Sequence, residues 1–108
     1  MTDEPILRPT QLADMVEYQD GSVVSRVLVK NKGGVQTLFA FAEGEGLTEH
    51  STPHDATVLM LEGSVLITIG SDEHPMESCQ MLRLPAGIPH ALHGEHAFKM
   101  LLTILKKR

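Results

Sequence analysis

The stretch that decides the fold is GEGLTEHSTPHDATVLMLEG, residues 44–63. Its first half is a glycine-punctuated, polar segment that holds His50, His54 and Asp55. Its second half is a run of β-branched and aliphatic residues that ends at Gly63, a pattern typical of a strand closed by a tight turn. Histidine-rich segments of this kind often bind metals. The stretch therefore predicts a β-rich domain with a candidate site at the entry to this strand.

The composition is that of one small globular domain. The chain has 108 residues, of which 42% are hydrophobic, enough for a single core. No apolar run reaches the ~20 residues of a membrane helix, and the acidic N-terminus MTDEPILRPT does not resemble a signal peptide. Cys79 is the single cysteine, so no internal disulfide forms and a reducing cytoplasm is expected. The net charge of −5 argues against a nucleic-acid partner.

A strand pattern fills the chain from Val23 onward. Apolar segments rich in β-branched residues alternate with turns of glycine, asparagine, proline or aspartate, which predicts an all-β sandwich or barrel. The segment VQTLFAFA is apolar on both faces, as expected for a strand inside a sandwich. The segment SDEHP, residues 71–75, is interpreted as a turn. The predicted strands are residues 23–30, 35–42, 56–63, 64–70, 79–85, 90–94 and 97–106.

Residues 1–20 are predicted to form an arm with a short helix, followed by one barrel domain over residues 21–108. In PTQLADMVEY, residues 9–18, Thr10 stands at the N-cap position. Three apolar residues then follow at helical spacing, namely Leu12, Met15 and Val16.

Two spaced motifs in the chain resemble those of the cupin family. The first cupin motif places Gly, His, His, Glu and Gly at fixed intervals, and here the corresponding positions hold Gly44, His50, Thr52, Ala56 and Gly63. The second places Gly, Pro, Gly, His and Asn, and here those positions hold Cys79, Pro85, Gly87, His90 and Gly94. All ten positions agree in spacing and six agree in identity. The resemblance implies the cupin double-stranded β-helix, a jelly-roll barrel.

The resemblance also implies where a metal would bind and which ligands this chain lacks. In metal-binding cupins, three histidines and a glutamate from the two motifs point into the barrel. His50 and His90 match two of those histidines, whereas Thr52 and Ala56 replace the other two ligands. Alanine has no donor atom, and threonine is a poor transition-metal ligand compared with imidazole. Half of the usual ligand set is therefore absent.

His54 offers a replacement ligand. With His50 and His90 it would give three imidazoles and open positions, a set that suits a divalent transition metal such as Zn, Fe, Ni or Mn. Pro53 interrupts regular strand geometry, so the alternation rule does not fix the direction of His54. Asp55 is expected to hold the loop through backbone hydrogen bonds, or to orient a histidine.

The alternation after the histidine segment predicts a lining for the barrel cavity. Residues two apart on a strand share a face, so Met60 shares its face with Ala56 and Val58. The predicted lining consists of Thr52, Ala56, Val58 and Met60, with Phe39 or Phe41 as further candidates.

The remaining histidines and the cysteine are interpreted as lying outside the site. His93 follows His90 on the opposite parity and is expected at the surface or rim. His96 and His74 are expected in solvated turns or loops. Cys79 stands at a glycine position of the motif and is interpreted as a small turn or core residue.

Two functions are open at this level. The first is a metal-dependent cupin enzyme, such as a dioxygenase, isomerase or decarboxylase, in which the metal polarises a small substrate or activates water or dioxygen. The second is a metal-free binding or sensor cupin whose histidines are hydrogen-bonding groups for a small molecule. The resemblance further implies a homodimer, and the apolar first and last strands, SVVSRVLVK and AFKMLLTILK, need cover.

Overall fold

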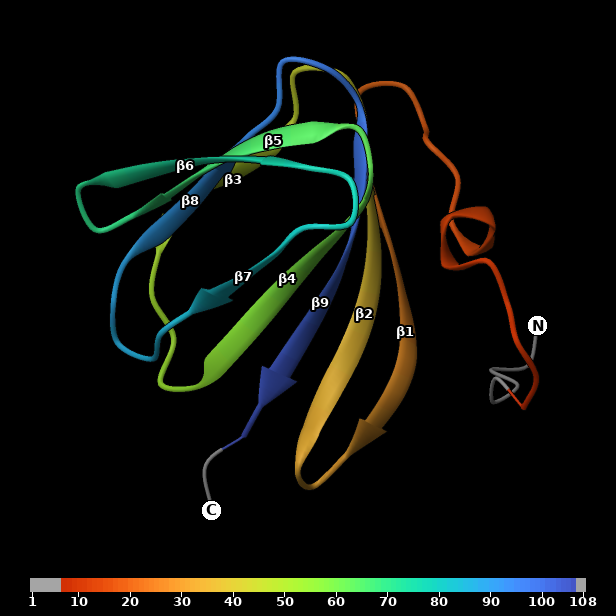
Figure 1. Cartoon of the computed structure of the whole chain (residues 1–108), viewed down its shortest axis with the longest axis horizontal. Coiled ribbons are helices and arrows are strands. Elements are labelled where there is room, and N and C mark those ends of the chain that lie inside the picture. Colours follow the sequence, from red (N-terminus) through yellow and green to blue (C-terminus); the bar gives the residue numbers. More distant parts are fainter. Residues whose placement is uncertain (1–6, 107–108) are drawn as a thin grey trace.

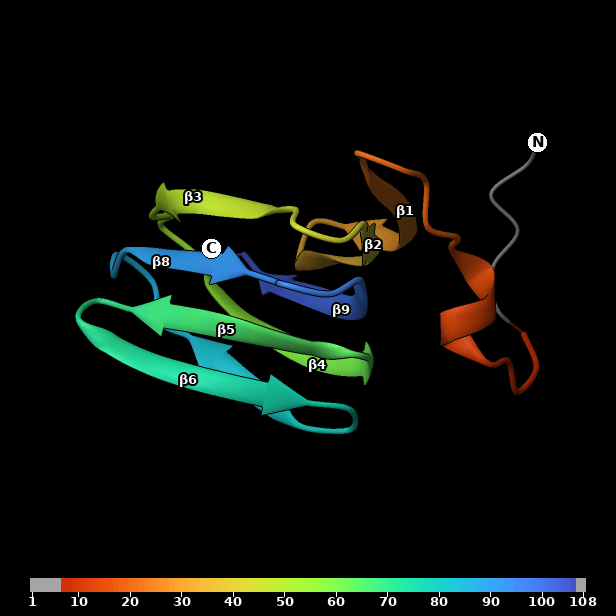
Figure 2. The same ribbon diagram turned by 90° about the horizontal axis from the view of Figure 1, so that it is seen from above.

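The protein is a sandwich of two antiparallel β-sheets. The computed structural model describes residues 7–106, and Figures 1 and 2 show its strands in two layers. A 3₁₀ turn, η1 (Leu12–Met15), comes first. The strands that follow are β1 (Val23–Asn31), β2 (Gly34–Phe41), β3 (Gly46–His50), β4 (Asp55–Glu62), β5 (Ser64–Ile69), β6 (Asp72–Glu77), β7 (Met81–Leu84), β8 (His90–His93) and β9 (Phe98–Leu105).

The strand order is that of a jelly-roll. One sheet has the order β1-β2-β9-β4-β7 and the other has the order β3-β8-β5-β6. After β2, the chain changes layer at every connection except the β5–β6 hairpin, so that β9 lies between β2 and β4, and β8 lies between β3 and β5. Every strand pairing is antiparallel. The predicted all-β jelly-roll fold is confirmed.

The main core lies between the inner faces of the two sheets. Strand β4 alternates as predicted, with Ala56, Val58 and Met60 turned inward and buried. Phe41 of β2 and Phe98 of β9 stack with ring centroids 4.4 Å apart, and both are fully buried. β2 is also buried on its outer face, through Leu38 and Ala40, as its two-sided apolar pattern predicts.

Two strands are not predicted by the sequence pattern. β3 is short and mostly polar, and its residues do not alternate between apolar and polar clearly enough to predict a strand. β6 occupies residues 72–77, where a turn was predicted, so His74 is a half-buried strand residue and its assignment to a loop is wrong. Pro75 is compatible with this strand because β6 is an edge of its sheet, where a missing N–H leaves no broken ladder bond.

The turns fulfil the roles predicted for them. Gly63 joins β4 to β5 with a φ of 80°, a left-handed conformation that glycine adopts without strain. Cys79 lies exposed in the β6–β7 turn with a φ of 70°. Its predicted place in a turn is confirmed, and the positive φ explains why cupins use glycine there.

The N-terminal arm differs from the predicted helix. Only η1 is helical, and Thr10 is no N-cap because its hydroxyl donates to the Arg8 carbonyl. Val16 is already extended. Leu12, Met15 and Val16 nevertheless pack together against the outer face of the five-stranded sheet. The spacing of these three residues therefore identified the buried face of the arm, whereas packing against the sheet determined its backbone conformation. The first six residues of the predicted arm lie outside the described residues.

Ionic and aromatic contacts fasten the arm to the sheet. The Lys99 ammonium, on β9, donates to the Ala13 carbonyl at 2.6 Å and lies 4.9 Å from the centre of the Tyr18 ring. The Tyr18 hydroxyl donates to Glu62 at 2.6 Å. Burial is the main cause that raises the pKa of Tyr18 above its usual range, and the contact with Glu62 raises it further.

The last strand does not lie at an edge of the molecule. β9 pairs with β2 on one side and with β4 on the other, so both of its backbone edges are paired within the chain, although Leu105 at its end is 54% exposed. The edge strands of the five-stranded sheet are β1 and β7. Among residues 7–106, no helix is long and apolar enough to cross a membrane.

Candidate functional site at the histidine end of the barrel

The two motif histidines meet at one end of the barrel, which we call the histidine end. His50 closes β3 and His90 opens β8, and the two residues are direct Cα partners. Their ring centroids are 4.4 Å apart, with the rings edge to face. Ile69, the last residue of β5, is the next residue in the same row. The structure therefore brings His50 and His90 together, while their binding of a metal stays a prediction.

A break in strand register turns His50 toward the barrel. His90 shares its strand face with Leu92, which is in the main core, so His90 points inward and is buried. Leu47 pairs with Leu92, and regular alternation would place His50, three residues later, on the opposite face. The register shift between Leu47 and His50 reverses this parity. No sequence pattern marks this irregularity.

The hydrogen bonds of the two histidines fix their ring protons. Nδ1 of His50 lies 3.0 Å from the Thr48 carbonyl oxygen, and Nδ1 of His90 lies 3.4 Å from the Ile88 carbonyl oxygen. Because a carbonyl oxygen only accepts, this network assigns the proton of each neutral ring to Nδ1. Nε2 of each ring is then the acceptor, and it is the atom able to bind a hydrogen-bond donor or a metal ion.

His90 is held in its neutral form. Burial lowers the pKa of His90 from its ordinary value, and the neighbouring His50 lowers it further. The contact with the Ile88 carbonyl acts in the opposite direction but does not cancel these effects. His90 therefore presents an uncharged imidazole near neutral pH.

The predicted ligand position Thr52 and the candidate His54 lie in a loop rather than on a strand. β3 ends at His50 and β4 begins at Asp55, so the alternation that a continuous strand would impose does not apply. The Thr52 hydroxyl donates to the His54 carbonyl at 3.1 Å and accepts from the His54 N–H at 3.4 Å. It thus shapes the loop. His54 is half-buried.

Asp55 joins this loop to the turn that precedes His90. Its Oδ1 accepts from the Ala86 N–H at 2.8 Å, and its Oδ2 pairs with the Arg83 guanidinium at 3.2 Å. The Gly87 N–H donates to the Thr52 carbonyl at 2.8 Å, which adds a second link between the same two segments. The predicted role of Asp55 in holding the loop through backbone hydrogen bonds is confirmed.

Pro85 and Gly87 build the turn that leads to His90. The Ile88 N–H donates to the Pro85 carbonyl at 3.4 Å, and Gly87 has a φ of 77°. Pro85 is the first residue of this turn and has a φ fixed by its ring, while Gly87 at the third position accepts the left-handed conformation at low cost. The sequence motif therefore has a structural role that does not depend on any activity.

The wall facing the histidines is apolar. On the inner face of the five-stranded sheet, Ala56 is a direct partner of Ile104 on one side and of Leu84 on the other. Ala56 and Leu84 are buried, and Ile104 packs against the main core. Further half-buried side chains pack against the same core, namely Phe39, Leu47, Ile69, Leu82 and Leu102.

The predicted cavity-lining residues lie at different depths. Val58 and Met60 are fully buried in the main core, and Ala56 is 7% exposed. Thr52 is half-buried in its loop. All three β4 residues point to the barrel interior, as predicted. Their contact with a ligand stays a prediction.

The donor set fits a transition metal only in part. His50 and His90 bring two imidazoles together, but among residues 7–106 no group of three or more His, Cys, Asp or Glu side chains is arranged to hold a metal ion. Alanine at position 56 supplies no carboxylate. A closed four-ligand cage is therefore not formed by these side chains.

His93 and His96 lie at the surface. His93 is exposed and is Cα partner to Gly46 and Leu66, and His96 is exposed in the segment between β8 and β9. Their predicted surface positions are confirmed.

The sequence matches the family model described as "Cupin domain" over residues 37–104. The chain is a cupin. Its structure resembles a conserved protein of unknown function from Streptococcus pyogenes, with 33% identity, a TM-score of 0.91, and coverage of 99% of this chain and 94% of that one. A cupin superfamily protein from Desulfitobacterium hafniense has 31% identity and a TM-score of 0.90, with coverage of 98% and 97%.

A longer relative shares only part of its length with this cupin. A cupin 2 conserved barrel domain protein from Leptotrichia buccalis has 38% identity and a TM-score of 0.83. The aligned region spans 87% of this chain but only 46% of the Leptotrichia protein. No curated protein matches the sequence. The comparisons thus define the family and the fold.

Proposed function

We propose that this cupin binds a small molecule at the histidine end of its barrel. The observation that carries the proposal is the pair of adjacent imidazoles, the exposed His50 and the buried His90, at the end of a β-barrel with an apolar core. A few polar groups in an apolar recess are the usual composition of a small-molecule site. The loop and turn around the pair are tied together through Asp55, so the two rings are held in place before a ligand arrives.

The chemistry of the pair selects the ligand class. Each ring directs a protonated Nδ1 to a backbone carbonyl, which leaves Nε2 as an acceptor. The two inner rows at this end, His50–His90–Ile69 and Ile104–Ala56–Leu84, contain no charged side chain. The favoured ligand is therefore an apolar molecule with a hydroxyl or N–H group, and a carboxylate is disfavoured because it would be desolvated without a cation.

A second candidate function is metal binding through the same Nε2 atoms. The edge-to-face contact of His50 and His90 favours it, with His54 as the third ligand and Zn, Fe, Ni or Mn as the ion. Such an ion would polarise an oxygen-containing substrate and make the protein a metal-dependent enzyme. The incomplete donor set is the reason that we place this function second.

The compartment is a further part of the proposal. The single Cys79 has no cysteine to pair with inside the chain, which is consistent with a reducing cytoplasm.

The test separates the two candidates. Nuclear magnetic resonance titrations would compare p-cresol, p-toluate and toluene, which share an apolar ring but differ in the polar group. We expect p-cresol to bind most tightly, with shifts in residues 50–56 and 84–92. The double variant His50→Ala, His90→Ala should lose this response, whereas the exposed His93→Ala control should keep it.

Metal content provides the second arm. Untagged protein would be reconstituted with Zn, Fe, Ni or Mn and analysed by plasma mass spectrometry, beside the same double variant. Metal near unit stoichiometry that is lost in the double variant would establish the second candidate in place of the first. If neither p-cresol nor a metal binds, both functions are wrong.

A further inference from the structure

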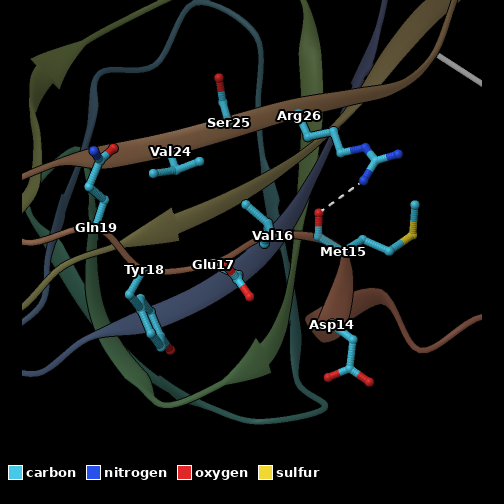
Figure 3. Close-up of a pocket in the computed structure, with 9 residues that line it drawn as sticks. All are labelled: Asp14, Met15, Val16, Glu17, Tyr18, Gln19, Val24, Ser25 and Arg26. Atoms are coloured by element: carbon cyan, nitrogen blue, oxygen red, sulfur yellow. Dashed lines mark hydrogen bonds between the residues drawn. The ribbon is translucent and has the colours of Figure 1, made fainter. Parts of the chain in front are cut away.

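A groove lies between the arm and the first strand of the five-stranded sheet. It has a volume of about 680 Å³ and is lined by residues 14–19 of the arm and residues 24–26 of β1, as Figure 3 shows. Small-molecule sites have volumes in this range. The arm packs on the outer face of the sheet, whereas the barrel interior lies against the inner face. The groove is therefore separate from the histidine end.

Part of the lining of this groove is apolar. Val16 of the arm is buried, and Met15 and Val24 pack against the apolar cluster that contains Val16. All three residues line the groove. Covering apolar surface stabilises a bound molecule. The lining therefore favours a ligand with an apolar body.

Arg26 brings a positive charge to the β1 wall of the groove. Its guanidinium is half-buried and donates to the Met15 carbonyl at 3.3 Å. A guanidinium has five N–H donors, and among residues 7–106 no carboxylate forms an ion pair with Arg26. A cation that is partly withdrawn from water is stabilised by an anion, and the planar guanidinium binds a carboxylate through two parallel hydrogen bonds. The β1 wall therefore favours a carboxylate on the ligand.

The arm brings negative charges to the opposite wall. Asp14 and Glu17 line the same groove, and both side chains are exposed. Within the described part of the chain neither carboxylate forms an ion pair, so neither one neutralises Arg26. These carboxylates favour a cationic group on the ligand. A ligand with a single charge would be attracted by one wall and repelled by the other.

We infer that this groove binds a short zwitterionic peptide of dipeptide size with apolar side chains. The C-terminal carboxylate of the peptide pairs with Arg26, and its N-terminal ammonium pairs with Asp14 or Glu17. Its side chains cover Val16 and Val24. A dipeptide fits this arrangement better than a free amino acid, because Arg26 contacts neither carboxylate and the ligand has to bridge the gap between them.

Other hollows on the surface lack this combination of charges. The hollow beside His93 and His96, of about 220 Å³, is lined by Glu95 but by no Lys or Arg. The hollow at the β1–β2 hairpin, of about 200 Å³, is lined by no ionisable side chain. Neither of these two hollows would select a zwitterion over a ligand with a single charge.

The charges of the ligand are tested first, with three peptides of similar size. Leucyl-leucine carries both charges, leucyl-leucinamide lacks the carboxylate, and N-acetyl-leucyl-leucine lacks the ammonium. Leucyl-leucine is expected to shift the nuclear magnetic resonance signals of residues 14–26 and to leave those of residues 84–92 unchanged. Each analogue should bind at least ~10-fold more weakly, because one charged contact is lost. No binding of leucyl-leucine, or equal affinities of the three peptides, would overturn the inference.

Variants then assign each charge to its wall. Arg26→Gln should bind leucyl-leucine and leucyl-leucinamide equally, because the partner of the carboxylate is gone. By the same reasoning, the double variant Asp14→Asn, Glu17→Gln should bind leucyl-leucine and N-acetyl-leucyl-leucine equally. The matched controls Lys32→Gln and Glu73→Gln change exposed residues outside the groove and should keep the wild-type preferences. Preferences that persist in the groove variants, or that the controls also lose, would contradict this assignment.

Arg26 also holds the arm, so a second readout separates loss of binding from release of the arm. Nuclear Overhauser contacts between Val16 and Leu38 report whether the arm is docked on the sheet. If Arg26→Gln loses these contacts, the double variant of Asp14 and Glu17 decides, because it leaves the hydrogen bond of Arg26 to the arm intact. A docked arm with an unchanged preference for leucyl-leucine over N-acetyl-leucyl-leucine would then refute the proposed site.

Discussion

The two ends of the barrel are built from different residues. At the end opposite the histidines, Phe41 and Phe98 stack and fill the space between the sheets. Gly94 packs so closely there that a Cβ would lie 2.5 Å from the Phe98 ring. At the histidine end, the small side chain of Ala56 and half-buried aliphatic residues lie between the sheets, and the polar loop at residues 51–54 follows His50. The comparison indicates that aromatic packing stabilises one end of the barrel, whereas the other end holds the two histidines of the proposed site.

The largest expected effect is at the aromatic end. Phe98→Ala removes a fully buried ring and its stacking contact with Phe41, and it should lower the free energy of unfolding by about 3–5 kcal/mol. Ile104→Val, a smaller truncation at the histidine end, should cost about 0.5–1.5 kcal/mol. Urea unfolding followed by circular dichroism measures both. Equal costs would remove the distinction between the two ends.

The next effect concerns the link between the loop and the turn. Asp55→Ala removes the acceptor for the Ala86 N–H and the partner of Arg83, and should destabilise the fold by about 1–3 kcal/mol. Arg83→Ala breaks only the exposed ion pair and should cost less than about 1 kcal/mol. Two results together would show that the backbone link positions the proposed site: Asp55→Ala is less stable than Arg83→Ala, and only Asp55→Ala loses p-cresol binding. A larger cost for Arg83→Ala would refute this role.

A smaller effect is expected from the arm at alkaline pH. The folded state raises the pKa of Tyr18, so its stabilising contribution is complete below the unfolded value near 10 and is lost as the pH rises toward the folded value. The free energy of unfolding should therefore fall from pH 9 to 11 more steeply in the wild type than in Tyr18→Phe. Parallel curves would show that Tyr18 is not held by Glu62 in solution.

The smallest effect on stability is expected at the site itself. His50→Ala replaces an exposed side chain and should change the free energy of unfolding by no more than about 0.5 kcal/mol. The same variant should bind p-cresol at least ~10-fold more weakly, because one of two acceptors is gone. A variant that loses stability but keeps p-cresol affinity would make His50 a structural residue and reverse the comparison of the two ends.

Much of the fold was predictable because it depends on local patterns. The alternation at Ala56, Val58 and Met60 identified an inward face, and the turn residues Gly63 and Gly87 marked the left-handed positions. The helix predicted around Leu12 failed in extent because contact with the sheet, and not helical propensity, sets the arm. β6 was missed because Pro75 is a turn signal everywhere except at a sheet edge.

By itself, the sequence determined the strand periodicity, the motif spacing, and the chemical fact that Thr52 and Ala56 replace two strong metal ligands. Only the tertiary structure decided that His50 faces His90, because a register shift in β3 reverses the alternation that sequence reasoning assumes. It also decided that the last strand is central while β1 is an edge. These outcomes depend on pairing between strands that are distant in the sequence. The local sequence pattern of a strand does not predict whether that strand lies at an edge of its sheet.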